Sequence, residues 1–191
     1  MLFILFLLVV SLPSVQTYFG TYATQQINEK FNTNIKVEKV GLQFNGDVEL
    51  KNILIKDHKN DSLISIKELN SSILSFANIN NNKLIFGGID IYGLFFHIKT
   101  YSGEQASNLD IFTGKFKKTK ETSSLFELSA TNFRVRDSYF KLTDENKTVQ
   151  EILDFQKLYI NADDFLILGP DVQTQINALR FKDVRGVEMH N

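Results

Sequence analysis

The chain contains no cysteine, no tryptophan and only two prolines among 191 residues, and its net charge is −1. Without cysteine there can be no disulfide, no thiolate-ligated zinc and no cysteine nucleophile. The balance of 21 basic and 22 acidic residues lacks the basic excess of a nucleic-acid-binding surface, so we expect no nucleic-acid partner. A hydrophobic content of 43% excludes a disordered tail, and the length suits one domain or two small ones.

Sequence motifs of enzymes are also missing. The three histidines, His58, His97 and His190, form no H-x-x-x-H or H-E-x-x-H pair, and no G-x-S-x-G occurs. The acidic pairs at 144–145 and 163–164 have no partner motif, so we interpret them as turn residues. We therefore expect no enzyme, no metal and no cofactor.

The N-terminus has no charged residue before Glu29, and residues 1–12 are apolar except Ser11. A helix over residues 1–12 would be about 18 Å long, shorter than the roughly 30 Å hydrocarbon core of a bilayer. A secretory signal peptide needs basic residues ahead of its apolar run, and a buried soluble helix is rarely apolar on every side. Of these three alternatives we favour part of a membrane anchor at 1–13. Its apolar residues are Leu2, Phe3, Ile4, Leu5, Phe6, Leu7, Leu8, Val9 and Val10.

A second helix is predicted over residues 14–31. Pro13 limits continuation of the apolar run, and Ser14 can cap a new helix. Apolar residues then recur at spacings of three and four, which is typical of an amphipathic helix. The predicted apolar stripe is Val15, Tyr18, Phe19, Tyr22, Ala23, Ile27 and Phe31, with Gln16, Gln25, Asn28 and Glu29 facing away. The helix could cover the end of a sheet or lie at a membrane surface.

From residue 32 onward the apolar period changes to two, which indicates strands. Ile35 and Val37 alternate with polar residues, as do Val40 and Leu42, with a one-residue slip that predicts a bulge or a break between two strands. The same apolar-x-apolar-x-x-apolar-x-apolar spacing recurs from residues 48, 89, 128 and 153. At this apolar content roughly six such windows arise by chance, so the recurrence supports a β-rich chain without proving a repeat protein.

Further strands are predicted near residues 64–66, 73–76, 84–86, 89–98, 126–135, 139–143, 153–168 and 173–181, with a short helix at 109–116. Regular spacing with polar turns favours a mostly antiparallel sheet. No long amphipathic helix follows Asn34 to cover its apolar face. That face must therefore be covered by a second sheet, by curling of the sheet on itself, or by a ligand.

Several strings resemble the TamB family, the translocation and assembly module of Gram-negative envelopes within the AsmA-like group. The strings are LPSVQTYFGTYATQQINEKFNTNIKVEKVGLQFNGDVELKNILIKD at 12–57, DSLISIKELNSSILSF at 61–76, GGIDIYGLFFHIKTY at 87–101, SNLDIF at 107–112, FKLTDEN at 140–146, GPD at 169–171 and FKDVRGV at 181–187. The resemblance covers nearly the whole chain, although these strings are typical of a family rather than of a catalytic motif.

The resemblance implies a mainly β fold. A curled antiparallel sheet would form an AsmA-like or chorein-like trough with an apolar interior, preceded by an N-terminal membrane helix and an amphipathic helix. It implies a single-pass inner-membrane protein with its bulk, residues 32–191, in the periplasm. Family members are far longer, so the chain would be an N-terminal fragment that is incomplete at its C-terminus.

The function implied is a bridge that carries phospholipid acyl chains between the inner and outer membranes. One alternative is a scaffold for outer-membrane protein assembly or protein secretion, which partners an Omp85-type barrel through a C-terminal part that this chain would lack. A second alternative is an ordinary secreted β-sandwich. For the bridge, the predicted residues lining the lipid groove are Ile35, Val37, Val40, Leu42, Val48, Leu50, Ile53, Ile55, Leu94, Phe96 and Ile98.

Overall fold

A computed structural model of the chain describes residues 12–43, 45–73, 83–116, 127–169, 171–183, 185–186 and 188–189. The membrane anchor predicted at residues 2–10 lies outside these ranges, as does part of the strand predicted near 73–76. Among the described residues, no helix combines the length and the apolar character needed to span a bilayer.

The described residues form one sheet and two helices. The order along the chain is α2 (Pro13–Phe31), β1 (Asn34–Leu42), β2 (Asp47–Lys56), β3 (Ser62–Ile73), β4 (Lys83–Thr100), α3 (Asn108–Gly114), β5 (Glu127–Asp144), β6 (Glu151–Leu168), β7 (Asp171–Asp183) and β8 (Glu188–Met189). The strands follow sequence order across the sheet, which does not close on itself. β4 and β5 pair in parallel, and the other neighbours pair antiparallel. The prediction of a mainly β, mostly antiparallel fold is thus confirmed.

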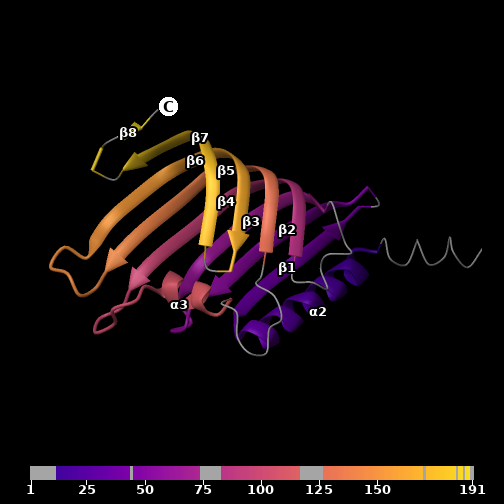
Figure 1. Cartoon of the computed structure of the whole chain (residues 1–191), viewed down its shortest axis with the longest axis horizontal. Coiled ribbons are helices and arrows are strands. Elements are labelled where there is room, and N and C mark those ends of the chain that lie inside the picture. Colours follow the sequence, from indigo (N-terminus) through magenta and orange to yellow (C-terminus); the bar gives the residue numbers. More distant parts are fainter. Residues whose placement is uncertain are drawn as a thin grey trace, which may run out of the picture.

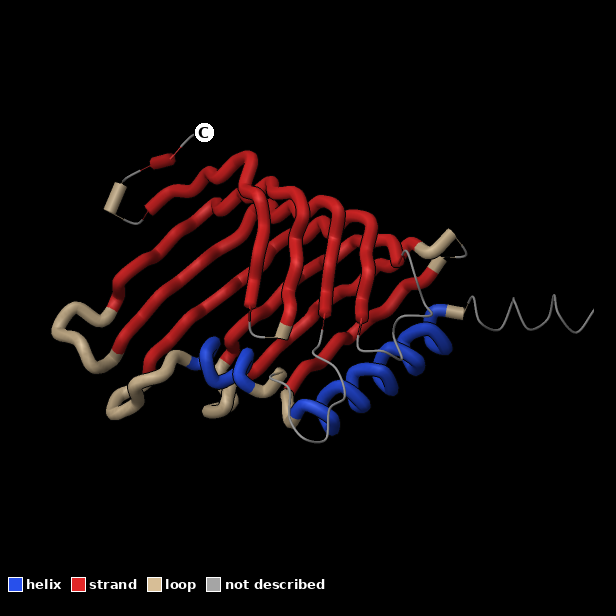
Figure 2. Tube along the Cα trace, in the orientation of Figure 1, coloured by secondary structure: helices blue, strands red, loops and turns tan. Residues whose placement is uncertain are grey.

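The sheet is strongly curled. Figure 1 shows the long strands β4 to β7 rising on one side, bending over at the top of the view and descending on the other side. The same course is visible in the trace of Figure 2, where α2 lies beside the β1 end of the sheet. The segments predicted as separate strands at 126–135 and 139–143 are therefore two parts of one bent strand, β5.

The slip between Val37 and Val40 is neither a register bulge nor a break, which corrects the sequence prediction. Val37 pairs with Ile53 and Val40 pairs with Leu50, so two residues separate the apolar pairs on both strands and the register is kept. One of the intervening residues, Asn52, has a φ of 54°. A positive φ turns the backbone out of the regular pleat, so the alternation of side chains restarts after it.

Positive φ values recur further across the sheet, in β4, β5 and β6. Gly93 in β4 and Asp137 in β5 have φ values of 66° and 46°, and both lie between the paired positions 92–136 and 95–139. Lys157 in β6 has a φ of 50° beside Leu158, which pairs with Ser138. The kinks therefore lie at matching places in adjacent strands.

A second kink lies further along β6. Asp164 has a φ of 52° within that strand, so the residues at 163–164 are part of a strand and not of the turn that the sequence predicted.

Helix α2 covers the free edge of β1. The Gln16 side chain donates to the carbonyl of Leu42 at 2.7 Å and accepts from its N–H at 3.0 Å. At the other end of α2, Asn28 does the same for Ile35, at 2.8 Å in both directions. Two side-chain amides thus take the place of a neighbouring strand and satisfy an edge that would otherwise be open to pairing.

The amphipathic stripe predicted for α2 is wrong in part. Tyr18 is 70% exposed and Tyr22 is 55% exposed, whereas the predicted outward residues Gln16 and Asn28 contact β1. The helix packs on a strand edge, where backbone groups need hydrogen-bond partners. Side-chain amides can supply these hydrogen bonds, whereas the aromatic rings of Tyr18 and Tyr22 cannot. The alternative in which the helix covers the end of a sheet is the one observed.

Candidate functional site

Cross-strand pairing aligns apolar residues in rows that run across the sheet. Within each row the paired residues share a face, because directly opposed side chains in neighbouring strands point the same way. Four of these rows are Ile35, Ile55, Ile64, Phe96, Phe140 and Phe155; Val37, Ile53, Ile66 and Leu94; Val40, Leu50, Leu69, Ile91, Val135, Ile160 and Leu179; and Leu42, Val48, Ser71, Ile89, Phe133, Ala162 and Ile176. We call the surface made by these rows the apolar face and the opposite surface the outer face.

The kinks keep these rows on a single face. In a regular strand, the step of three from Val37 to Val40 would put the two side chains on opposite faces. Residues from both sides of the kink nevertheless pack in one cluster: Ile53, Ile66, Ile89, Ile91, Ala130 and Val135 are its buried members. The sheet can therefore bend and still present one continuous apolar surface.

All eleven residues predicted to line a lipid groove lie on the apolar face. Ile53 belongs to the buried cluster, and Val37, Leu50, Ile55 and Leu94 pack against it. Val48 is buried at 9% exposure. The remaining five are half-buried: Ile35, Val40, Leu42, Phe96 and Ile98.

The sequence prediction did not include the residues on β5 and β6 that complete this face. Val135 and Ala162 are completely buried, and Leu158 is 5% exposed. The repeated spacing from residues 128 and 153 pointed to these strands. It could not be separated from chance matches without knowing that the kinks align.

Among the described residues, nothing covers the apolar face at the β7 end of the sheet. Along the row that contains Ile89, exposure rises from 5% at Ile89 and 0% at Ala162 to 56% at Ile176. Val172, which pairs with Ile167, is 58% exposed. In the described part of the chain, β8 pairs with β7 only at Phe181 and Lys182. Most of the outer edge of β7 is therefore open, and apolar side chains stand beside it.

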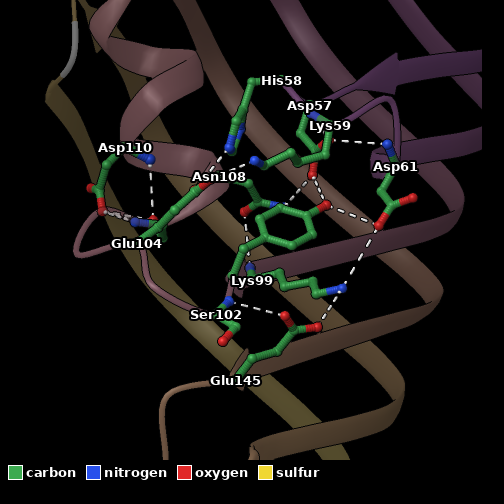
Figure 3. Close-up of polar contacts among 12 residues, drawn as sticks. Asp57, His58, Lys59, Asp61, Lys99, Ser102, Glu104, Asn108, Asp110 and Glu145 are labelled. Atoms are coloured by element: carbon green, nitrogen blue, oxygen red, sulfur yellow. Dashed lines mark hydrogen bonds and ion pairs between the residues drawn. The ribbon is translucent and has the colours of Figure 1, made fainter.

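A polar network holds the loops at one end of the strands (Figure 3). The hydroxyl of Tyr101 lies 2.7 Å from a carboxylate oxygen of Asp57 and 2.9 Å from one of Asp61. Asp57 is 6% exposed and also accepts from the side chain of Asn108, itself 1% exposed, at 3.1 Å. The ammonium of Lys99 lies 2.8 Å from the carboxylate of Glu145, which directly follows β5.

Burial and hydrogen bonding shift the pKa values of Asp57 and Tyr101 in opposite directions. Burial raises the pKa of Asp57, but donors outweigh it: the Tyr101 hydroxyl, the Asn108 amide and two backbone N–H groups hold that pKa below its ordinary value. Burial and the two carboxylates raise the pKa of Tyr101. Each group thus keeps the charge state in which its hydrogen bonds form, which suits a fixed loop brace better than proton transfer.

Neither catalysis nor metal binding is evident in the part of the chain that the structure describes. His58 and Lys59 both contact Glu104, at 2.8 Å and 2.9 Å. No group of three or more His, Cys, Asp or Glu side chains in the described ranges could hold a metal ion. The apolar face and its open end are therefore the strongest candidate site.

The comparisons with known proteins assign no function to this site. No protein-family model matches the chain, and no curated protein matches it. Function is therefore inferred from the geometry of the sheet and from the resemblance of the sequence strings.

Proposed function

We propose that the chain binds phospholipid acyl chains along the apolar face of its bent sheet, as the N-terminal part of a TamB-like bridge between the inner and outer membranes. The observation that carries the proposal is the uninterrupted run of apolar rows from β1 to β7, which ends in the exposed side chains of Val172 and Ile176. A closed sandwich would bury such residues. A surface that carries acyl chains leaves Val172 and Ile176 accessible at the end of the sheet where the acyl chains leave it.

Apolar contact alone suffices for this task. Each methylene removed from water contributes about 0.8 kcal/mol, so a chain of many methylenes binds without any specific polar partner. Binding of this kind is insensitive to the identity of the headgroup and allows sliding along the face. The expectation of an inner-membrane anchor and of a periplasmic location belongs to the same proposal.

The experiment is native mass spectrometry with lipid extraction on the 191-residue chain, purified from a bacterial host in mild detergent. We expect bound phospholipid in the wild type and an occupancy reduced about fivefold or more in the double variant Val172→Asp/Ile176→Asp, because buried charge is costly beside an acyl chain. Gln173→Asp, exposed on the outer face of the same strand, is the matched control and should keep the lipid. A lipid-free wild type with a cooperative, lipid-independent melt would contradict the proposal.

A scaffold for outer-membrane proteins is the second candidate, and the open edge of β7 favours it. An exposed strand edge can pair with an incoming strand of a client protein. Photocrosslinkers at Thr174 and at Asn177 would then capture unfolded outer-membrane protein instead of lipid. An Omp85-type partner, as the resemblance implies, would engage a part of the protein beyond this chain.

A further inference from the structure

A groove of about 860 Å³ lies between helix α2 and the first four strands. Its floor includes Lys36, Leu54, Ser65 and Phe95, which are paired in sequence from β1 to β4. These residues alternate with the apolar row that contains Val37, so they lie on the opposite face. The lining also includes Ile35, Val37, Ile53 and Ile66 of the apolar face, so the groove adjoins that face at the β1 end of the sheet, where Figure 1 shows α2.

The walls of the groove differ in polarity. Leu54 and Phe95 supply apolar surface from the sheet, while Thr21, Thr24 and Gln25 line the groove from α2. The helix wall is fixed to the sheet by the paired hydrogen bonds at both ends of α2. A volume of this size is within the range of sites for small organic ligands.

Two cations are part of the lining. The stem of Lys67 crosses the kink at Gly93, where an added Cβ would lie 2.6 Å from the lysine Cδ. Its ammonium lies 5.9 Å from the ring centroid of Tyr92. Within the described ranges no carboxylate lies in ion-pair distance of Lys67 or of Lys36. The groove's one acidic lining residue, Glu38, accepts a hydrogen bond from Asn52 at 2.6 Å.

We propose that this groove binds one phospholipid molecule, with its phosphate at Lys36 and Lys67 and an acyl chain against Leu54 and Phe95. The charge complementarity carries the choice of ligand: two cations without carboxylate partners stand at the rim of a groove with an apolar floor, which matches an anionic group on an apolar tail. The proposal rests on the function proposed above, and it adds a site of headgroup recognition to a face that recognises only acyl chains.

The experiment uses the 191-residue chain in mild detergent, with a photocrosslinking residue at Thr24 in the groove or at Gln26, which is exposed and does not line it. The probes are dioleoyl phosphatidylglycerol, which carries an anionic phosphoglycerol headgroup, and dioleoylglycerol, which lacks it. We expect crosslinking to phosphatidylglycerol at Thr24 and not at Gln26. Lys36→Glu/Lys67→Glu should weaken it about tenfold, because two charge-assisted contacts become repulsive.

The controls separate headgroup recognition in the groove from acyl-chain binding on the rest of the apolar face. Lys39→Glu/Lys56→Glu reverses one charge on β1 and one on β2, both outside the groove, and should leave the crosslink unchanged. Equal crosslinking of both probes, or an unchanged yield in Lys36→Glu/Lys67→Glu, would overturn the headgroup site while lipid bound at the apolar face persists. Absence of lipid from the whole chain would overturn both proposals.

Discussion

Gly20 lies where α2 packs closely against Val40 of β1. A Cβ at Gly20 would lie 2.2 Å from Cγ2 of Val40 and 3.0 Å from its Cβ. Both atoms are on a short branched side chain that cannot swing away, so the helix would have to shift and its edge hydrogen bonds would lengthen.

Gly20→Ala is therefore predicted to destabilise the fold by about 1–3 kcal/mol, although alanine is the better helix former. Urea denaturation followed by circular dichroism measures the change. Gly114→Ala is the control in the other helix, since no atom lies within 4 Å of its added Cβ, and it should be neutral or slightly stabilising. Equal effects of the two substitutions would show that the contact with Val40 is unimportant.

The Tyr101 hydroxyl makes the stability of the loop brace dependent on pH. The pKa of Asp57 is held below its ordinary value in the folded chain, so the unfolded chain takes up the proton first as the pH falls. The stabilisation from this carboxylate is complete above about pH 5 and is lost as the pH falls through the folded-state pKa, below about pH 4.

Tyr101→Phe should remove about 1–3 kcal/mol at pH 7, because a buried carboxylate loses a donor, and the loss should shrink toward pH 3. Urea unfolding at several pH values measures both effects. Tyr22→Phe, on an exposed ring, should follow the wild-type curve. A loss in Tyr101→Phe that is the same at pH 7 and pH 3 would mean that the hydroxyl does not act through Asp57.

At the scale of secondary-structure elements, the two amides of α2 protect the edge of the sheet. Asn28→Ala removes both bonds to Ile35, and we expect a loss of about 2 kcal/mol. The amide of Ile35 should also exchange faster with solvent hydrogen. Gln25→Ala, on the same helix without a bond to the edge, is the control for helix propensity. Unchanged protection of Ile35 in Asn28→Ala would contradict the role given to the amide.

A residue at a kink should respond to glycine substitution differently from its neighbours in the strand. Lys157 occupies a positive φ of 50°, a conformation that glycine adopts without steric cost. We expect Lys157→Gly to be neutral or to stabilise β6 by up to about 1 kcal/mol. The neighbouring Gln156→Gly should destabilise the strand by about 1 kcal/mol, as glycine usually does. Thermal melts compare the two, and equal destabilisation would indicate that the kink at Lys157 is not needed.

The strands could be predicted from sequence because their apolar residues alternate, and the slip from Val37 to Val40 was visible in the same pattern. Its meaning could not be predicted, since the sequence does not show which strand carries the positive φ: Asn52 of β2 does, whereas no described residue of β1 or β3 does. The amide contacts of Gln16 and Asn28 could not be predicted either. Polar side chains at a strand edge look, in sequence, like residues facing solvent.

The residues of the candidate site followed from the same alternation. The eleven predicted residues share a face because the apolar side chains return to the same face of the sheet after each step of three residues. The groove beside α2 could not be found in this way, since it depends on which side of the β1 edge the helix covers. Lys36 and Lys67 are separated by 31 positions of sequence, and only the pairing of β1, β2 and β3 brings them to one groove.

At the scale of the whole molecule, the apolar face is a core at its middle and an accessible surface at its β7 end. Ile89 and Ile176 are the same residue type in one row. Ile89, on β4, is 5% exposed, and Ile176, on β7, is 56% exposed. Leu50, a natural choice for a charged substitution, packs against the buried cluster and would test the fold more than the lipid. The pair Ile89 and Ile176 separates the two effects.

Ile89→Asp is predicted to cost more than about 4 kcal/mol and to unfold the chain, because it puts an unpaired carboxylate in the core. Ile176→Asp should change stability by less than about 0.5 kcal/mol, since the side chain already meets water. Urea denaturation provides both values. A cooperative loss of the fold in Ile176→Asp would mean that β7 is covered and that the sheet is a closed core. A stable Ile176→Asp variant that fails to retain phospholipid would instead support passage of acyl chains over this end of the sheet.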